Sequence, residues 1–297
     1  MLALPVTWGS GAAAAPTFVG APVDVRLATA AWGAAVACTG RDGAALDEVS
    51  IERKTVPGNY LGVARTDALG RLYRIDLNTG DARLSEVLVH EVSHAWVSDG
   101  PVALVEGTAE LIADCIVERL PGLAPLQYDD GRDLSGLPDL RTWSKPVEGT
   151  PTELHAVRTD AYLGAARLMR TARIAAPDAA WWADRRVDWE GFEAALEAAG
   201  PRGRALVLAL HGGVEAQRAA LVDADRDGLT ALAESWLGTD DARVDTDADG
   251  WSDPALLGVP AGAVPVPLDA TPVCTGTVAE LAPAVVTGGN LRGAWLP

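Results

Sequence analysis

Long apolar runs, basic residues and cysteines are all scarce in this sequence. No stretch approaches the roughly 18 consecutive apolar residues of a transmembrane helix, so a membrane span is not expected. Only 24 Lys and Arg residues oppose 41 Asp and Glu residues, which leaves a formal net charge of −17. Phosphate backbones and anionic lipids repel such a chain, and nucleic-acid binding is therefore not expected.

The three cysteines are too few for a disulfide framework and lack the spacing of a zinc ribbon. Cys115 lies in an apolar helical pattern and is expected to be a buried thiol. Cys38 and Cys274 could form one disulfide if the protein is exported. Residues 1–19 are similar to the end of a secretory leader but lack its basic start, so a leader or a flexible N-terminus is expected there. The expected location is the extracellular space or the cell envelope.

What is present is the composition of a folded protein with a large core, since 48% of the 297 residues are apolar and 22% are charged. β-Branched residues in partial alternation predict strands at 23–27 and 48–54. Further strands at 60–66 and 71–77 flank a turn that ends in glycine, which predicts a half-buried antiparallel hairpin. Its second strand places Tyr73, Ile75 and Leu77 on one face, with Arg74 and Asp76 on the other.

A helical period replaces the strand pattern after residue 84. The predicted helices span 84–97, 101–120, 159–173, 189–199 and 201–210. The expected fold class is therefore α+β, with a small antiparallel or mixed sheet followed by helices.

The run His90-Glu91-Val92-Ser93-His94 is the most informative motif of the chain. Two histidines four residues apart on a helix project from one face, and their imidazole nitrogens can ligate one zinc ion. Glu91 reaches the same opening, where a carboxylate can take a proton from a zinc-bound water. The chain has only four histidines, and two of them have this spacing on an otherwise apolar helix.

Glu106 is the predicted third ligand. His94 lies shortly before a helix break, and Glu106 lies shortly after Pro101 at the start of the next helix. Two helices joined by so short a loop run antiparallel about 8–10 Å apart, so residues equidistant from the loop come side by side. Glu110 is one turn further on and can accept a hydrogen bond from the free ring nitrogen of His90. The alternative is that Glu106 and Glu110 form the exposed side of an amphipathic helix.

Together with Leu104-Val105-Glu106-Gly107-Thr108-Ala109-Glu110, the histidine motif resembles the gluzincin zinc metallopeptidases. In that family an HExxH helix precedes a second helix that carries a glutamate ligand. The resemblance implies a complete set of roles: zinc ligands His90, His94 and Glu106, general base Glu91, and Glu110 as the partner that orients a ligand. The metzincins, the other HExxH group, do not fit, because Val97 and Gly100 occupy the places of their glycine and third histidine.

The resemblance covers roughly residues 48–215 and implies two further features. The hairpin is similar to the strands along the gluzincin cleft, whose exposed edge could hold an extended peptide by main-chain hydrogen bonds. Residues 160–164 are similar to a later helix of that family, in which a tyrosine hydrogen-bonds the tetrahedral oxyanion. Tyr162 is the candidate for this role, and His155 is the alternative.

The stretch from His211 to Asp253 carries eleven acids against three bases and predicts a calcium-binding module. A calcium loop has oxygen ligands at positions 1, 3, 5, 7 and 12 and glycine at position 6. One run matches every position: Asp223, Asp225, Asp227, Leu229 and Glu234, with Gly228 at the sixth place. A second copy contains Asp245, Asp247, Asp249 and, at its ninth place, Asp253, but has Leu256 where the glutamate should be. It either binds weakly or borrows a ligand such as Asp240.

These loops resemble the thrombospondin type 3-like repeats of bacterial secreted proteins, in which neighbouring loops share calcium ligands. The expected domains are a metallopeptidase-like domain at 20–215, calcium repeats at 216–260 and a C-terminal extension at 261–297. The leading prediction is a monomeric zinc-dependent peptidase, with Zn²⁺ and Ca²⁺ as cofactors and a peptide or protein as substrate. The alternative is a non-enzymatic surface or adhesion protein that keeps the peptidase fold as a scaffold. The intact Glu91 argues against it, because a site that only binds metal needs no base.

Overall fold

The computed structural model describes residues 15–56, 60–79, 83–120, 123, 134–144, 155–177, 179, 187–248 and 253, and excludes the side chains of 155–158. Over this part of the chain, eight helices and one small mixed sheet form a mixed α/β fold. The strands are β1 (Thr17–Val19), β2 (Ala45–Lys54), β3 (Gly62–Thr66) and β4 (Leu72–Asn78). The helices are α1 (Pro22–Thr39), α2 (Leu84–Ser93), α3 (Val102–Arg119), α4 (His155–Ala175), α5 (Trp189–Ala199), α6 (Pro201–His211), α7 (Val214–Leu221) and α8 (Ala231–Leu237).

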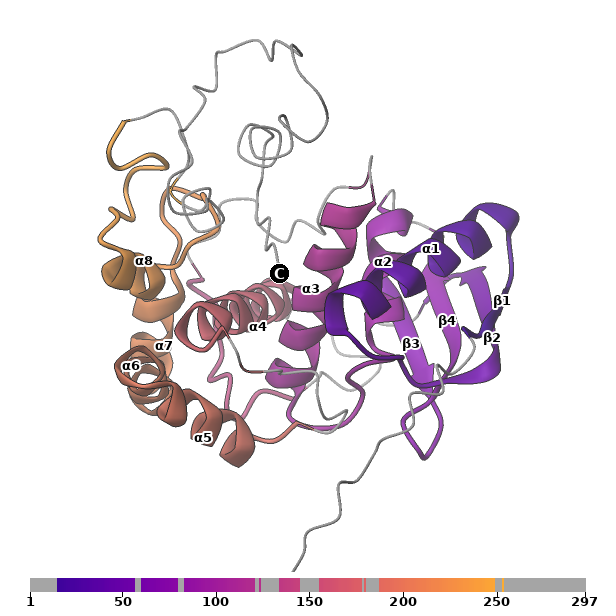
Figure 1. Ribbon diagram of the computed structural model, residues 1–297, viewed down its shortest axis with the longest axis horizontal. Coiled ribbons are helices and arrows are strands. Elements are labelled where there is room, and N and C mark those ends of the chain that lie inside the picture. The colour runs from indigo at the N-terminus through magenta and orange to yellow at the C-terminus, as the bar shows by residue number, and fades with distance from the viewer. Residues whose placement is uncertain are drawn as a thin grey trace, which may run out of the picture.

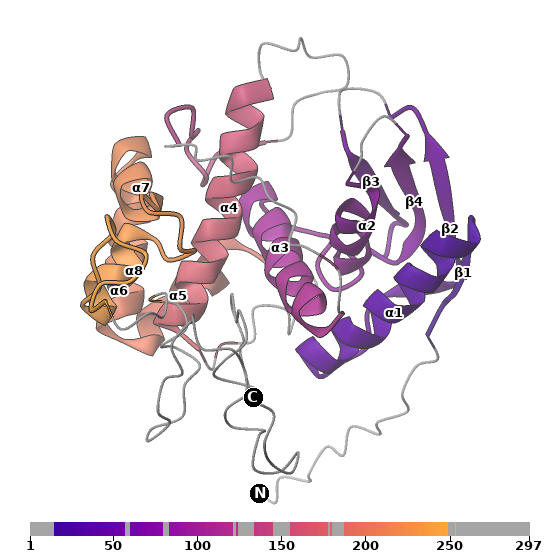
Figure 2. The same cartoon turned by 90° about the horizontal axis from the view of Figure 1, so that it is seen from above.

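The elements divide into a sheet half and a helical half that meet at α3 and α4. Figures 1 and 2 show the sheet with α1 and α2 at one end, α3 and α4 in the middle, and α5 to α8 at the other end. Residues on α1, α2 and the sheet form one apolar core, which extends to Ile112 and Ile116 of α3. A second core joins α3 and α4 to α5, α6 and α7. None of the described helices has the length and hydropathy required to cross a bilayer.

The sheet has the strand order β1-β2-β4-β3, so β3 is an edge strand within the described chain. β1 pairs with β2 and β2 with β4 in parallel, whereas β3 and β4 pair antiparallel. The expected hairpin is thereby confirmed. Ile75 and Leu77 are buried on β4, whereas Tyr73, expected on the same face, is 37% exposed.

Residues 23–27, expected as a strand, instead begin helix α1. Pro22 occupies the first helical turn, where its fixed φ suits a helix, and Asp24 in the same turn complements the helix dipole. Alanine, the strongest helix former, dominates the sequence that follows. The strand prediction is wrong because it weighed two valines without the alanine-rich run that continues the helix.

Asp76 on β4 is fully buried, although the alternation of the strand predicts that it faces away from the core. Three bases surround its carboxylate, with Lys54 at 2.8 Å, Arg65 at 2.5 Å and Arg74 at 3.1 Å. Burial acts to raise the pKa of Asp76, but the hydrogen bonds and charges of these bases lower it on balance. The polar face expected on β4 is therefore present. Asp76 lies at its centre and is buried because long basic side chains cover it.

The predicted helices agree with the structure apart from their ends. α2 ends at Ser93, four residues before the expected position, and the chain then turns, with the N–H of Ala95 and of Trp96 donating to carbonyls three residues back. α4 begins at His155, earlier than expected, while α5 has the expected bounds. Arg41, just after α1, accepts a hydrogen bond from the Trp96 indole and donates one to the Trp96 carbonyl. These bonds fix the turn that directly follows the histidine motif.

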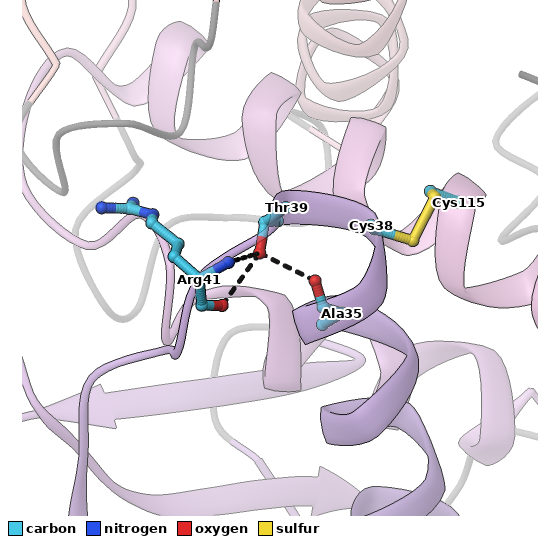
Figure 3. The surroundings of a disulfide bond; sticks show 5 residues. All are labelled: Ala35, Cys38, Thr39, Arg41 and Cys115. Atoms are coloured by element: carbon cyan, nitrogen blue, oxygen red, sulfur yellow. Dashed lines mark hydrogen bonds between the residues drawn. A yellow bond between two sulfur atoms is a disulfide. The ribbon is translucent and has the colours of Figure 1, made fainter. Parts of the chain in front are cut away.

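A disulfide joins Cys38 at the end of α1 to Cys115 on α3 (Figure 3). The expectation that Cys115 is a free buried thiol is therefore wrong, as is the suggested pairing of Cys38 with Cys274, a residue that lies outside the described chain. The sequence pattern predicts mainly strands over residues 20–80, so it does not indicate that Cys38 lies near α3. The helix α1 observed there brings Cys38 against α3. Thr39 donates a hydrogen bond to the carbonyl of Ala35 at 2.8 Å and closes the last turn of α1 beside the bond.

Reduction of this disulfide is expected to destabilise the sheet half. The bond closes a loop with a sequence separation of 77, which corresponds to about 4.5 kcal/mol of lost chain entropy in the unfolded state, and measured effects are often about 2–4 kcal/mol. Urea unfolding of a Cys38→Ser/Cys115→Ser variant should show a loss in that range. Mass mapping without reductant should recover a peptide that links Cys38 to Cys115. A peptide that links Cys38 to Cys274 would contradict the structure.

Candidate metal centre

His90 and His94 on the α2 segment meet Glu106 on α3. One ligand atom from each of the three lies within 4.8 Å of the other two, and all three side chains are buried. Glu106 Oε2 is 3.3 Å from His90 Nε2 and 3.7 Å from His94 Nε2. The two helices flank a short turn, so the expectation that residues equidistant from it come side by side is met. The alternative in which Glu106 and Glu110 face solvent is wrong, since each is only 1% exposed.

The other ring nitrogen of each histidine has a partner of its own. His90 Nδ1 is 2.8 Å from Glu110 Oε1, and His94 Nδ1 is 3.2 Å from the Val97 carbonyl oxygen. Oxygen atoms this close to both Nδ1 atoms favour the tautomer that carries hydrogen there, which leaves the Nε2 lone pairs to converge with Glu106. Two imidazoles and one carboxylate form a donor set that suits zinc, and three protein ligands are typical of a catalytic zinc site.

The charges around His90 favour a cation at this point. Burial acts to lower the pKa of His90, but Glu110, Glu106 and Glu91 raise it well above the ordinary 6.5. A buried group of three acids and two histidines has an excess of negative charge, which either a proton or a metal ion can neutralise.

Helix α4 supports α3 from the side away from the sheet. Arg170 of α4 forms two hydrogen bonds with Asp114 of α3, at 2.7 and 3.0 Å. Gly107, next to Glu106, lies so close to Ala165 and Met169 of α4 that a Cβ atom would overlap them. The glycine thus permits the close helix contact that places Glu106.

Glu91 is buried beside the histidines, and its carboxylate is held by the sheet. The backbone N–H of Ala64 on β3 donates to Glu91 Oε2 at 2.6 Å. The base candidate therefore lies between the metal ligands of its own helix and the edge strand that is expected to hold a peptide.

The two oxyanion candidates have different outcomes. Tyr162 is buried on α4, where its ring packs edge-on against Trp143 with centroids 5.2 Å apart. Its contact with a substrate oxyanion stays a prediction. His155 begins α4, and its side chain lies outside the described part of the chain.

A second group of acids gathers at the first acidic loop, residues 223–234. Asp223, Asp225 and Asp227 bring one oxygen each within 4.8 Å of one another, and Asp227 does the same with Glu234 and Asp253. Glu234 is 1% exposed, and neither of its oxygens has a hydrogen-bond donor among the described residues. A buried carboxylate with no donor requires a cation or a proton, and this cluster of oxygen ligands suits calcium.

The pKa values in this cluster reflect its burial and crowding. Burial and the neighbouring acids raise the pKa of Asp227 to about 7. Burial, Asp241 and the other acids raise that of Glu234 to about 8. Bound calcium would offset the repulsion that causes these shifts.

The described part of the second loop shares one backbone feature with the first. Arg226 and Ala248, at the fourth place of each loop, both have positive φ, of 67° and 59°. Leu229, at the seventh place of the first loop, is buried and donates its N–H to Asp227. The metal-ligand groups found in the described chain include neither Asp245 nor Asp247, and Asp249 lies outside it.

Sequence reasoning missed two residues of the acidic cluster. Asp253, which the sequence pattern assigns to the second repeat, groups with Asp227 and Glu234 of the first. The position of Asp253 at the ninth place of the second repeat is the signal that could have indicated this role. The borrowing of Asp240 by the second loop stays a prediction. Arg167, buried on α4, lies 3.7 Å from Asp223 and donates to the Leu221 carbonyl, and no local pattern marks it.

Replacement of Glu106 by Ala is expected to remove the metal. Loss of an outer partner such as Glu110 typically weakens metal affinity about 10- to 100-fold, and loss of a ligand should exceed that. Chelator competition followed by elemental analysis would give both values. Glu118→Ala, on the exposed end of the same helix, is the control. Full zinc occupancy in Glu106→Ala would show that Glu106 is not a ligand.

Comparison with known proteins adds no relative, because no family model, curated protein or solved structure matches this chain.

Proposed function

We propose that this protein is a zinc-dependent peptidase that hydrolyses peptide bonds with Glu91 as general base. The convergence of His90 Nε2, His94 Nε2 and Glu106 Oε2 beside a buried Glu91 is the observation that carries the proposal. A site that only binds metal has no use for an additional buried carboxylate next to its ligands.

The ligand residues and their partners have separate tasks in this mechanism. Zinc, when bound, supplies a Lewis acid that lowers the pKa of a coordinated water and polarises the scissile carbonyl. Glu91 takes the proton of the attacking water at its carboxylate and delivers it to the leaving amine. Glu110, whose Oε1 lies 2.8 Å from His90 Nδ1, orients the ring and so keeps Nε2 directed at the metal position. Tyr162 is the candidate donor to the developing oxyanion.

Calcium is the proposed second cofactor, held by the first acidic loop. Its ligands are Asp223, Asp225, Asp227 and Glu234, with Asp253 added from the second repeat. The Glu234 oxygens that lack a donor support this assignment. Sites of this kind fill at the millimolar calcium levels found outside cells, which agrees with the disulfide and with an exported protein.

A non-enzymatic surface or adhesion protein remains the second candidate, favoured only by the acidic repeats. Elemental analysis and hydrolysis of a mixed peptide library decide between the two. The peptidase should contain one zinc per chain, lose hydrolysis on treatment with a zinc chelator and regain it when zinc is added back. A zinc-loaded chain that cleaves no member of the library would favour the non-enzymatic candidate.

A further inference from the structure

The edge strand β3 presents alternate main-chain groups to opposite sides. Leu61, directly before β3, accepts a hydrogen bond from the N–H of Asn78 at the end of β4. In an antiparallel ladder the residues that bond the partner strand alternate with those that face away. Val63 and Arg65 therefore direct their N–H groups at β4, whereas Gly62 and Ala64 direct theirs away from it.

One of these outward groups already has a partner. The Ala64 N–H donates to Glu91 Oε2 at 2.6 Å, so the sheet edge contacts the proposed base directly. Hydrogen bonds from a neutral donor to a carboxylate are among the stronger ones, and this one fixes an otherwise flexible side chain. The acceptor is buried, which excludes water as an easy substitute.

Gly62, two residues earlier on the same side of β3, provides the space for the base. A Cβ atom at Gly62 would lie 2.7 Å from Glu91 Oε1, 2.9 Å from Glu91 Cγ and 2.6 Å from Val87 Cγ1. All three atoms belong to side chains of α2, and the Glu91 side chain is the one that can rotate. The side chains of Glu91 and Val87 on α2 thus leave no room for a Cβ at Gly62.

We propose that β3 positions the catalytic base: Ala64 holds one carboxylate oxygen through its N–H, and Gly62 leaves the space in which the carboxylate lies. Gly62 and Ala64 are positioning residues that touch neither metal nor substrate in this role. The inference rests on the proposed peptidase function for its kinetic consequence, while the contact itself is independent of any activity.

Hydrogen exchange of the Ala64 amide, followed by NMR, tests the contact without an assay. An outward amide on an edge strand exchanges rapidly unless something other than the sheet protects it. Glu91→Ala should lower the protection of Ala64 about tenfold or more, and Glu91→Gln should retain most of it, because an amide oxygen still accepts. The Val63 amide, bonded to β4, should stay protected in every variant and reports that the hairpin is intact. Unchanged Ala64 protection in Glu91→Ala would overturn the proposal.

Gly62→Ala tests the consequence for the reaction. The added methyl group should displace Glu91 and lower kcat about 100-fold, a loss that a displacement near 1 Å in a reacting group can cause. KM should change by no more than roughly twofold and zinc content should stay the same, because the base acts in the transition state and not in binding. Gly33→Ala on α1, where a Cβ meets nothing within 4 Å, is the control.

The outcomes separate this inference from the proposed function. A wild-type protein without hydrolysis would contradict the peptidase function, and the exchange of Ala64 would still decide whether β3 holds Glu91. An active wild type with an unchanged kcat in Gly62→Ala would contradict the positioning role and leave the peptidase function standing.

Discussion

Glu91→Gln is expected to abolish peptide hydrolysis while the protein retains its zinc. The substitution keeps the size of the side chain and its ability to accept from the Ala64 N–H, but it removes the group that takes up a proton. General base catalysis typically contributes 10²–10⁴-fold, so kcat should fall by about three orders of magnitude. The measurement is turnover on the best peptide of the library, together with zinc content.

The control for this variant is Glu86→Gln in the first turn of the same helix, outside the metal group. It removes a carboxylate of equal charge from α2 and should leave kcat close to the wild-type value. If Glu91→Gln retained comparable turnover, another group would have to be the base. If it lost its zinc, Glu91 would be a ligand, and the separation of roles between Glu91 and Glu106 would be wrong.

Local spacing carries most of what the sequence could predict about the metal centre. The interval between His90 and His94 depends only on the period of a helix, and the partnership with Glu106 depends only on the short turn between α2 and α3. The hairpin of β3 and β4 follows equally from strand pattern and turn chemistry. Each of these arrangements requires contacts within a few tens of residues.

Features that depend on contacts between distant parts of the chain could not be predicted from local sequence patterns. The disulfide requires α1 to lie against α3, and the sequence pattern predicts a strand where α1 begins. Asp76 is buried because Lys54 of β2, Arg65 of β3 and Arg74 of its own strand cover it, and the alternation within one strand cannot indicate the two neighbours. The bond from Ala64 to Glu91 joins a strand to a helix through a backbone group, so no side-chain pattern marks it.

The acidic cluster is continuous with the helical half, and this leads to the second major prediction. Leu221, Leu232 and Trp236 pack on the same core as α4, α5 and α6. Thr230, which caps α8 inside the first acidic loop, shares a buried 2.8 Å hydrogen bond with Thr171 of α4. Arg167 on the same helix lies 3.7 Å from Asp223. Removal of calcium is therefore expected to destabilise the helical half as well as the acidic loops.

The size of the effect follows from mass action. Calcium at about 100 times its dissociation constant stabilises a folded protein by about 2.7 kcal/mol, which corresponds to a decrease in Tm of about 5–10 °C when EGTA removes it. Because α4 also contacts α3 through Arg170 and Asp114, zinc affinity should weaken in parallel. Proteolysis confined to residues after 221, with α4 still protected from exchange, would show instead that the acidic loops unfold alone.

The decrease in Tm caused by EGTA should become larger as the pH rises. Without calcium, the folded protein holds the pKa of Asp227 at about 7 and that of Glu234 at about 8, above their ordinary values of 3.8 and 4.5. Below about pH 4 these groups are protonated in both the folded and the unfolded chain, whereas above about pH 8 they are ionised in both and the full repulsion acts on the fold. The free energy of unfolding of the calcium-free protein should therefore decrease as the pH rises from about 4 to about 8.

Calorimetry at pH 5.5 and pH 8, each with calcium or with EGTA, would test this dependence directly. The Tm difference between calcium and EGTA should be several degrees larger at pH 8, where the carboxylates are ionised and calcium has no protons to displace. Glu234→Gln should lose most of that difference, because it removes a buried ligand whose two oxygens have no other donor among the described residues. Glu215→Gln, whose side chain is 83% exposed and pairs with Arg218, should behave as the wild type. Identical melting in calcium and EGTA at both pH values would eliminate the calcium site, and with it the expectation that the cluster stabilises the helix beside the metal centre.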